Sequence, residues 1–232
     1  MALRVNQLIG FGGRVRDLTR TKLLCHFDGP DASTNIVDSS GFGHILTPAG
    51  DAQIDTAQSV FGGASLLLDG TDLVTVPAHA AWDLTGKDVC VEARIRFTSW
   101  PASTTAHIII GASDGSSNHW IFYVYSDGKI AAGANGVNEF TSAAGVIALN
   151  TWYAVRIERK NSTGRSDIYV NGTSVVNSTT TWVTDGSGQT LRIGASATDG
   201  TRGCAGNIDE LRLSHVLRDG ANYTPATTPF PF

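Results

Sequence analysis

The 232-residue sequence has few charged residues and no long apolar run. Lys, Arg, Asp and Glu make up only 16% of the chain, and the formal net charge is −4. A protein that follows nucleic-acid phosphates carries clustered Lys and Arg, so we expect no nucleic-acid partner. A bilayer-spanning helix needs ~20 consecutive apolar residues, and no segment reaches that length, so we expect no membrane span.

Cysteine is also scarce. Cys25, Cys90 and Cys204 are odd in number and form no C-x-x-C motif, which predicts neither a disulfide framework nor a zinc knuckle. We expect buried free thiols instead. The first residues lack the basic flank, apolar run and small-residue cleavage site of a secretory signal, so we expect synthesis in a cytosol without export by the usual route.

What the sequence does contain is typical of a β-protein. It has 26 glycines and many Thr, Ser, Val and Ile residues, which favour short strands joined by tight turns, whereas helical periodicity is nearly absent. All-β sandwiches of about 200–250 residues are commonly single domains. We therefore predict one antiparallel β-sandwich of about 12–14 strands.

The clearest strand spans residues 205–214. Its apolar positions Ile208, Leu211 and Leu213 are interspersed with the polar Glu210 and Arg212, as in a strand with one buried face. Asp209 interrupts this pattern. Its carboxylate is expected either to accept backbone hydrogen bonds at a bulge or loop, or to face a cation.

Two other segments carry predictions about individual residues. Residues 89–97 alternate strictly, and we expect their polar face, with Cys90, Glu92, Arg94 and Arg96, to be exposed. Asn171-Gly172 is the residue pair that a two-residue type I′ hairpin turn requires.

Several motifs, taken in order, resemble the laminin-G-like, concanavalin A-type jelly rolls. They are L-L-C-H-F-D-G at 23–29, D-S-S-G-F-G-H at 38–44, F-G-G-A-S at 61–65, Y-V-N-G at 169–172 and N-I-D-E-L-R-L at 207–213. The resemblance implies an all-β antiparallel β-sandwich jelly roll over residues 21–216. It leaves an N-terminal arm at 1–20 and an extended C-terminal strap at 217–232.

The end of the chain resembles the laminin-G-like proteins that tailed bacteriophages encode. There the closing strand is followed by A-x-Y-T, here Ala221 to Thr224, and a tail rich in Pro and Phe. The resemblance implies a non-enzymatic virion structural protein, either a capsid decoration or a tail-associated protein, located in the virion. Its expected partners are other virion proteins, further copies of itself and glycans of the bacterial surface. The alternatives are a host-recognition lectin and, more weakly, a glycoside hydrolase.

The arm supplies candidate contacts for such partners. Its apolar residues Leu8, Ile9 and Phe11, followed by Arg14 and Arg16, are expected to dock on a partner subunit. The alternative is a strand or strap that packs on its own domain. In the C-terminal strap, the prolines exclude a central strand, and Phe230 and Phe232 are expected to pack against the domain or a neighbour.

The resemblance also bears on catalysis. The jelly-roll glycosidases of this superfamily carry facing carboxylates in a Glu-x-Asp-x-Glu strand, and this triplet is missing from the sequence. Asp209 and Glu210 are neighbours on one strand, so they point to opposite faces. Gly-x-Ser-x-Gly, H-E-x-x-H and Walker motifs are absent as well. We expect no enzymatic activity.

Two kinds of binding residue remain. Jelly rolls of this type often hold an ion between the first and last strands, so Asp28 and Asp209 are candidate ligands of a structural Ca²⁺; we expect no other cofactor. Trp100 and Trp182, in loops rich in Thr and Ser, are candidates for glycan or partner contact. The alternative for Asp28 is a plain turn residue, and the alternative for Asp209 is an acceptor of backbone hydrogen bonds. For the two tryptophans, the alternative is a ring that anchors its loop. Trp152, which opens a strand, is expected in the core.

Overall fold

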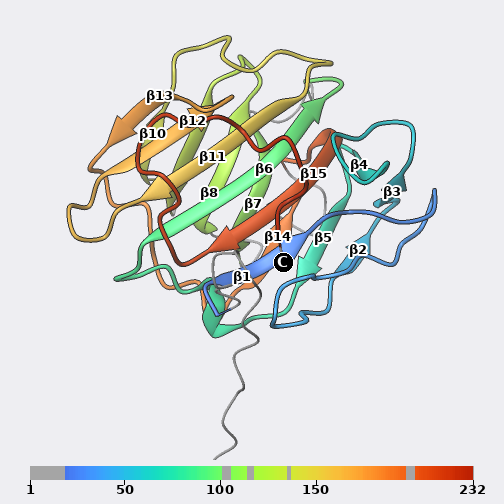
Figure 1. Ribbon diagram of the computed structural model, residues 1–232, viewed down its shortest axis with the longest axis horizontal. Coiled ribbons are helices and arrows are strands. Elements are labelled where there is room, and N and C mark those ends of the chain that lie inside the picture. Colours follow the sequence, from blue (N-terminus) through green and yellow to red (C-terminus); the bar gives the residue numbers. More distant parts are fainter. Residues whose placement is uncertain (1–18, 101–105, 114–117, 135–136, 197–201, 232) are drawn as a thin grey trace, which may run out of the picture.

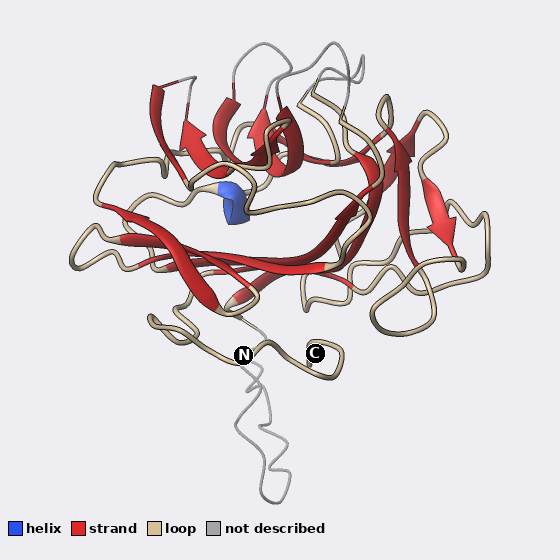
Figure 2. Ribbon diagram, turned by 90° about the horizontal axis from the view of Figure 1, so that it is seen from above, coloured by secondary structure: helices blue, strands red, loops and turns tan. Residues whose placement is uncertain are grey.

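A computed structural model of the chain describes residues 19–100, 106–113, 118–134, 137–196 and 202–231. Within these residues, fifteen strands form two antiparallel sheets, and the only helix is a short 3₁₀ turn, η1 (Ala80–Trp82). Figure 2 shows the sheets edge-on as two stacked layers. The predicted all-β jelly-roll sandwich is confirmed. No helix of this part of the chain is long and apolar enough to cross a membrane.

The eight-stranded sheet has the order β13 (Thr173–Ser178), β12 (Ser166–Val170), β11 (Tyr153–Arg159), β6 (Val89–Phe97), β15 (Ala205–Ser214), β4 (Ser65–Asp69) and β3 (Gln53–Asp55), with β1 (Thr21–Cys25) also paired to β15. The seven-stranded sheet has the order β10 (Val137–Thr141), β9 (Ile130–Ala134), β8 (Asn118–Tyr125), β7 (Ala106–Ser113), β14 (Thr190–Ile193), β5 (Leu73–Val76) and β2 (Thr47–Ala49). The strand count exceeds our estimate of 12–14 because β2 and β3, of three residues each, are too short to show an alternating pattern.

The core lies between the two sheets. Trp82, Trp120 and Trp182 are among its largest fully buried side chains, and each indole N–H donates a hydrogen bond of 2.8 or 2.9 Å to an oxygen. Burying an indole without such a bond would be costly. The three cysteines are free and buried as expected, and burial raises the pKa of each thiol well above its usual value.

Strand β15 occupies the predicted position and organises the eight-stranded sheet (Figure 1). It pairs with β6 on one side and with β4 and then β1 on the other. The register against β6 shifts between Asp209 and Arg212, and Glu210 has a φ of +51°. A β-bulge was one of the alternatives expected at Asp209. Because Ile208 and Leu211 on either side both face the core, the bulge places Asp209 and Glu210 on the same outer face, so the expectation that they point to opposite faces was wrong.

The Asn171-Gly172 turn joins β12 to β13. Both residues have positive φ, 49° and 83°, as a type I′ turn requires, and Val170 pairs with Thr173 across it. A Cβ atom on Gly172 would lie 1.9 Å from the carbonyl oxygen of Tyr223. Glycine therefore serves both the turn and the close approach of the C-terminal segment.

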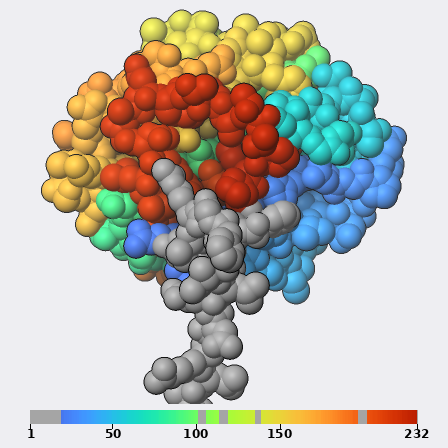
Figure 3. Space-filling model, viewed as in Figure 1, coloured from blue at the N-terminus to red at the C-terminus, as the bar shows by residue number. Residues whose placement is uncertain are grey.

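That segment, residues 217–231, is called the C-terminal strap below. It crosses the outer face of the eight-stranded sheet over β15, β6 and β11, and Figure 3 shows it as a dark-red arch on the surface. The prediction that the polar face of residues 89–97 is exposed was therefore wrong. Glu92 and Arg94 are only 3% and 7% exposed, because the strap lies over them.

Candidate functional site

The face beneath the strap carries a buried network of charged side chains centred on Glu92. Register places Glu92 of β6 directly between Arg156 of β11 and Arg212 of β15. Its carboxylate accepts hydrogen bonds from Nε and Nη2 of Arg212 at 3.0 and 2.6 Å and from Nε of Arg156 at 2.9 Å. Burial alone would raise the pKa of Glu92, but the charges of Arg212, Arg156 and Arg218 hold it below its usual value.

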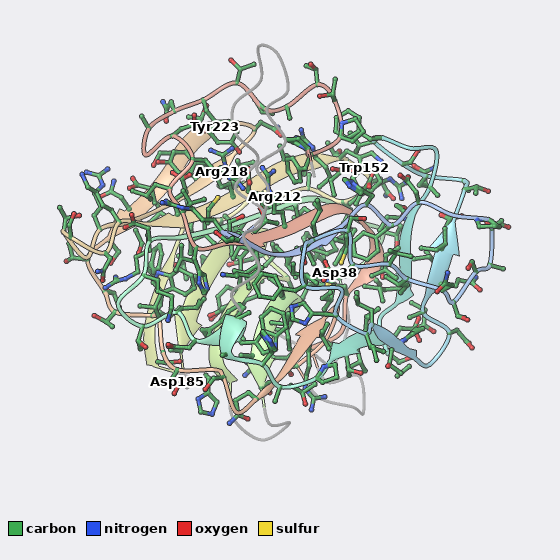
Figure 4. All side chains as sticks on the ribbon, turned by 60° about the horizontal axis from the view of Figure 1, so that its bottom comes forward. Asp38, Trp152, Asp185, Arg212, Arg218 and Tyr223 are labelled. Carbon is green, nitrogen blue, oxygen red and sulfur yellow. The ribbon has the colours of Figure 1, made fainter. Side chains whose placement is uncertain are left out.

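Two aromatic rings of the strap cover this network. Tyr223 places its ring over the guanidinium of Arg156, 3.5 Å from ring centroid to Cζ, and Phe230 does the same over Arg212 at 4.0 Å. Figure 4 shows Arg212, Arg218 and Tyr223 side by side. Desolvated cation–π contacts of this kind contribute about 2 kcal/mol each.

Backbone hydrogen bonds fix the strap along its length. The Glu158 carboxylate accepts from the amides of residues 218, 219 and 220 at 2.8–3.2 Å. Glu210 accepts from the amide of Phe230 at 2.6 Å, and Arg94 donates to the carbonyl of Ala226 at 2.5 Å. The charged face thus holds the strap in place and is closed to ligands.

Beside the start of the strap, an open groove of about 430 Å³ runs along the outer face of β12. We call it the β12 groove. It is lined by Lys160, Thr163, Arg165, Asp167, Tyr169, Ser174, Gly220, Ala221 and Asn222. Small-molecule sites usually have volumes of about 300–1,000 Å³. The strap supplies one wall of the groove, so the groove exists only while the strap is in place.

Hydrogen bonds order the walls of the β12 groove. The turn between β11 and β12 is closed by the Lys160 amide donating to the Arg165 carbonyl at 2.8 Å. Arg165 holds Asp167 in a bidentate pair, with Nε to Oδ2 at 2.8 Å and Nη2 to Oδ1 at 2.7 Å. Across the groove, the Ser174 amide donates to Oδ1 of Asn222 at 2.8 Å and ties the strap to β13.

The lining of the β12 groove suits binding and carries no catalytic arrangement. Its one carboxylate, Asp167, is already paired with Arg165, and the described lining contains no His or Cys. Burial and the charge of Asp167 raise the pKa of Tyr169 to about 12, so this phenol stays protonated at neutral pH. What remains is a set of hydroxyl, amide and cationic groups that can contact a polar ligand.

A second polar cluster lies on the seven-stranded sheet. Tyr125, half-buried at the end of β8, donates to Oε2 of the exposed Glu139 at 2.7 Å, and Tyr123 donates to the same oxygen. Burial raises the pKa of both phenols, so the two tyrosines act as donors. The carboxylate is thereby occupied by the two phenols.

Asp209 takes the role of backbone acceptor at the bulge. It is fully buried, and its Oδ2 accepts from the amides of Val60 and Phe61 at 2.8 and 3.1 Å. Burial raises its pKa to about 6. Its Oδ1 is buried without a partner among the described residues, which is the one observation here that fits a cation.

The second predicted calcium ligand, Asp28, is exposed in the loop that follows β1. Burial of part of its carboxyl group raises its pKa, and so does the negative charge of Glu210. The hydrogen bond to Glu210 raises the pKa of His26, and the negative charges of Asp28 and Asp209 raise it further. Both aspartates therefore lie near this imidazole. Over the part of the chain that the structure describes, no three His, Cys, Asp or Glu side chains are placed to hold a metal ion.

The two candidate tryptophans differ in accessibility. Trp182 is fully buried and donates to Oγ of Ser166 at 2.8 Å, so it is a core residue and offers no ring to a ligand. Trp100 is half-buried against Phe97 and His107 and anchors its loop. Trp152 was expected in the core and is instead half-buried at the surface (Figure 4).

The predicted docking arm lies outside the described residues, as does Phe232. This applies to all its candidate residues: Leu8, Ile9, Phe11, Arg14 and Arg16. The described chain begins at Thr19, whose carbonyl accepts a hydrogen bond from Lys22. Phe230 packs against the domain as predicted.

An apolar patch lies close to the start of the described chain at Thr19. The exposed large hydrophobic side chains of the described residues are Val37, Phe42 and Ile45, exposed by 56%, 40% and 73%. Asp38 makes their loop rigid, because its carboxylate accepts from the amides of residues 24, 40 and 44 at 2.8–3.1 Å. Lys22 lies over the Phe42 ring at 4.7 Å, so this loop patch adjoins the strand that follows the arm.

Sequence reasoning missed the β12 groove because four separate segments build it. Two signals point to it in retrospect. Arg165 and Asp167 are two residues apart at the start of a strand and so share one face. The Asn171-Gly172 turn brings β13 back beside them. The contribution of the strap has no local signal in the sequence.

Comparison with protein families gives one match. The laminin G family that is described as the concanavalin A-like lectin/glucanases superfamily matches residues 68–221. A search among curated protein sequences finds no match.

Solved structures share the fold at low sequence identity. The binding domain of botulinum neurotoxin DC in complex with SialylT has a TM-score of 0.61 and 14% identity, covering 87% of this chain and 49% of that one. A structure of botulinum neurotoxin type C, whose cell entry depends on two ganglioside molecules, has a TM-score of 0.58 and 16% identity. The alignment covers 88% of this chain and 49% of that one. The chain thus spans about half the length of these toxin structures.

A smaller neighbour is matched over nearly its whole length. Domain 4 of AbnA, an extracellular GH43 arabinanase from Geobacillus stearothermophilus, in complex with arabinotriose, has a TM-score of 0.59 and 18% identity. The alignment covers 84% of this chain and 92% of that domain. Identities this low establish a shared fold and no more.

Proposed function

The chain belongs to the concanavalin A-like lectin/glucanases superfamily, and on that premise we propose that it is a non-enzymatic carbohydrate-binding module whose combining site is the β12 groove. One observation carries the proposal. The groove is open, ordered by hydrogen bonds on both walls and lined by hydroxyl, amide and charged groups without a catalytic pair. Sugars are recognised by such convergent polar groups.

Structural neighbours support this class of ligand. Cell entry of one neighbour depends on gangliosides, a second is in complex with SialylT, and a third is in complex with arabinotriose. The absence of facing carboxylates in the described groove supports a binding role over hydrolysis.

The test is a steric block with a matched control. Ala221 is exposed and lines the groove, and Ala57 is exposed beyond the opposite edge of the same sheet. On a glycan array with the full chain, Ala221→Trp should abolish saccharide binding and Ala57→Trp should leave it intact. Equal binding by both variants would reject the groove. Release of reducing ends from a bound polysaccharide would reject the non-enzymatic role.

We further propose that this module is a bacteriophage virion protein, a capsid decoration or a tail-associated component that resides in the virion. The loop patch of Val37, Phe42 and Ile45 supports this role, because an exposed apolar patch suits attachment to other proteins. The patch adjoins β1, the strand that follows the arm in the sequence. The partners would be other virion proteins or further copies of this chain, and the glycans would be those of the bacterial surface.

Attachment is tested by incorporation into particles. Removing residues 1–18, or replacing Ile45 by Ser on the loop patch, should reduce incorporation while saccharide binding by the free protein is retained. Val175→Ser, a half-buried change on the other edge of the domain, controls for lost stability. Normal incorporation of both variants would reject attachment through this end of the molecule.

A structural Ca²⁺ between Asp28 and Asp209 is also proposed, on the unpartnered Oδ1 of Asp209. If the ion binds, calcium should raise the melting temperature relative to EDTA, and Asp28→Asn should abolish the difference. Identical melting in calcium and EDTA would exclude the ion.

A further inference from the structure

We propose that the saccharide bound in the β12 groove is an acidic one, a sugar carrying a carboxylate such as a uronic acid, and that Lys160 is the residue that recognises its charge. This inference rests on the proposed function and specifies its ligand. Three features of the groove carry it: its charge, its supply of hydrogen-bond donors, and the position of its only aromatic ring.

The charges of the β12 groove do not cancel. Its lining holds two cations, Lys160 and Arg165, and one anion, Asp167. Arg165 and Asp167 neutralise each other in their bidentate pair. Lys160 is exposed, and its ammonium has no ion-pair partner among the described residues. The groove therefore presents one uncompensated positive charge in a protein whose formal net charge is −4.

Hydrogen-bonding capacity is biased in the same direction. Both oxygens of Asp167 already accept from Arg165, so the groove's only carboxylate has most of its capacity filled. Asn222 uses its Oδ1 to accept from the Ser174 amide, which leaves its Nδ2 group as the available end. The ammonium of Lys160 has three donors and no acceptor. A ligand rich in acceptors, with a negative charge, complements this set.

The aromatic ring of the groove cannot supply an alternative basis for recognition. Tyr169 is only 1% exposed, with its ring against that of Tyr223 at 5.6 Å between centroids. No ring face is therefore open to stack on a neutral sugar, and selectivity must come from polar and ionic contacts. A nucleic acid is disfavoured, because a single uncompensated lysine does not form the clustered basic track that a chain of phosphates needs.

The size of the effect follows from the exposure of the site. Hydrogen bonds to charged groups are stronger than neutral ones, but Lys160 is exposed, so solvent screening weakens its contribution. A difference of about 1.4 kcal/mol corresponds to a tenfold change in Kd. We expect the carboxylate to improve affinity by about tenfold at low salt, and screening to diminish this preference at 0.5 M salt.

The test uses a ligand pair that differs only in charge. Calorimetric titration of the full chain with an oligogalacturonide and with its methyl ester compares the carboxylate and its neutral form on one sugar backbone. Lys160→Gln removes the recognising cation. Lys129→Gln, on the turn between β8 and β9 of the other sheet, changes the net charge by the same amount away from the groove.

We expect the free acid to bind about tenfold more tightly than the ester to the unmodified chain and to Lys129→Gln, whereas Lys160→Gln should bind both equally. Equal affinity of the unmodified chain for acid and ester would overturn the acidic specificity and leave the carbohydrate-binding function standing. Loss of the preference in both lysine variants would show a general charge effect and overturn the role of Lys160. If neither probe binds while neutral glycans bind on the array, the inference fails and the proposed function survives; if nothing binds in either experiment, both fail.

Discussion

Replacing Glu92 by Gln tests the buried network that holds the strap. The change keeps the size of the side chain and removes its charge. In the structure this carboxylate accepts from two guanidinium groups at 2.6–3.0 Å, and a third, that of Arg218, lies 3.6 Å away. Glu92 is 3% exposed, and Arg156 and Arg212 are 6% and 5% exposed. Arg156 keeps its ion pairs with Asp219 and Glu158, but the buried guanidinium of Arg212 loses its carboxylate partner, and water cannot reach it to compensate.

The magnitude follows from this geometry. Removing one partner of a buried ion pair typically costs about 3–5 kcal/mol, because the other charge remains buried without compensation. The amide of Gln also turns a donor toward one guanidinium. Domains are stable by only about 5–15 kcal/mol, so a loss of this size should be conspicuous. We expect Glu92→Gln to lower the free energy of unfolding by about 3–5 kcal/mol.

Urea unfolding followed by tryptophan fluorescence measures this loss. The matched control is Asp51→Asn, a carboxylate-to-amide change at an exposed position, which should cost at most about 0.5 kcal/mol. Because the folded state lowers the pKa of Glu92, its contribution is present above the ordinary Glu pKa and is lost as pH falls through the lower, folded value. The gap between the unmodified chain and the variant should shrink in acid. A loss below about 1 kcal/mol at neutral pH would refute the account of the network.

Three further predictions concern the strap, its turn and the bulge. Deleting residues 221–232 removes the rings of Tyr223 and Phe230, so thermal melting should show a loss of about 3–6 kcal/mol, together with loss of saccharide binding; an unchanged melting temperature would mean that the strap contributes nothing. Gly172→Ala forces a Cβ to within 1.9 Å of the Tyr223 carbonyl at a φ of 83°, so its urea midpoint should fall by more than that of Gly188→Ala, where a Cβ meets nothing. Asp209 has a folded pKa raised to about 6, so it should favour the folded state increasingly as pH falls from 7 to 4, by up to about 3 kcal/mol relative to Asp209→Asn, in pH-dependent urea titrations; parallel curves for the two proteins would contradict the raised pKa.

Local patterns in the sequence were sufficient to predict the sandwich, because alternation and turn chemistry are local properties. The strand at 205–214 and the Asn171-Gly172 turn are found where they were predicted, and a bulge, one of the alternatives given for Asp209, is found there. Residues 89–97 show where the same reasoning fails. Alternation identifies two faces of a strand, but it does not say whether a segment 120 residues further on will cover the polar one.

The candidate site depends more on such distant contacts. Trp182 is buried in the core between the sheets, where its indole donates to Ser166 of β12, and no feature of its Thr-rich loop indicates this. The β12 groove needs a hairpin, a neighbouring strand and the strap to meet. Of these, only the hairpin has a local signal. Family resemblance therefore suggests a class of ligand, whereas the proposed place of binding can be seen only in the structure.

The central claim is that a saccharide binds where the strap meets β12. Titrating the isotopically labelled full chain with an oligogalacturonide, and following backbone amide shifts by NMR, tests it directly. The account predicts saturable shifts confined to residues 160–167, Ser174 and 220–222. Shifts that cluster instead around Tyr125 and Glu139 on the seven-stranded sheet, with the β12 groove unchanged, would contradict it.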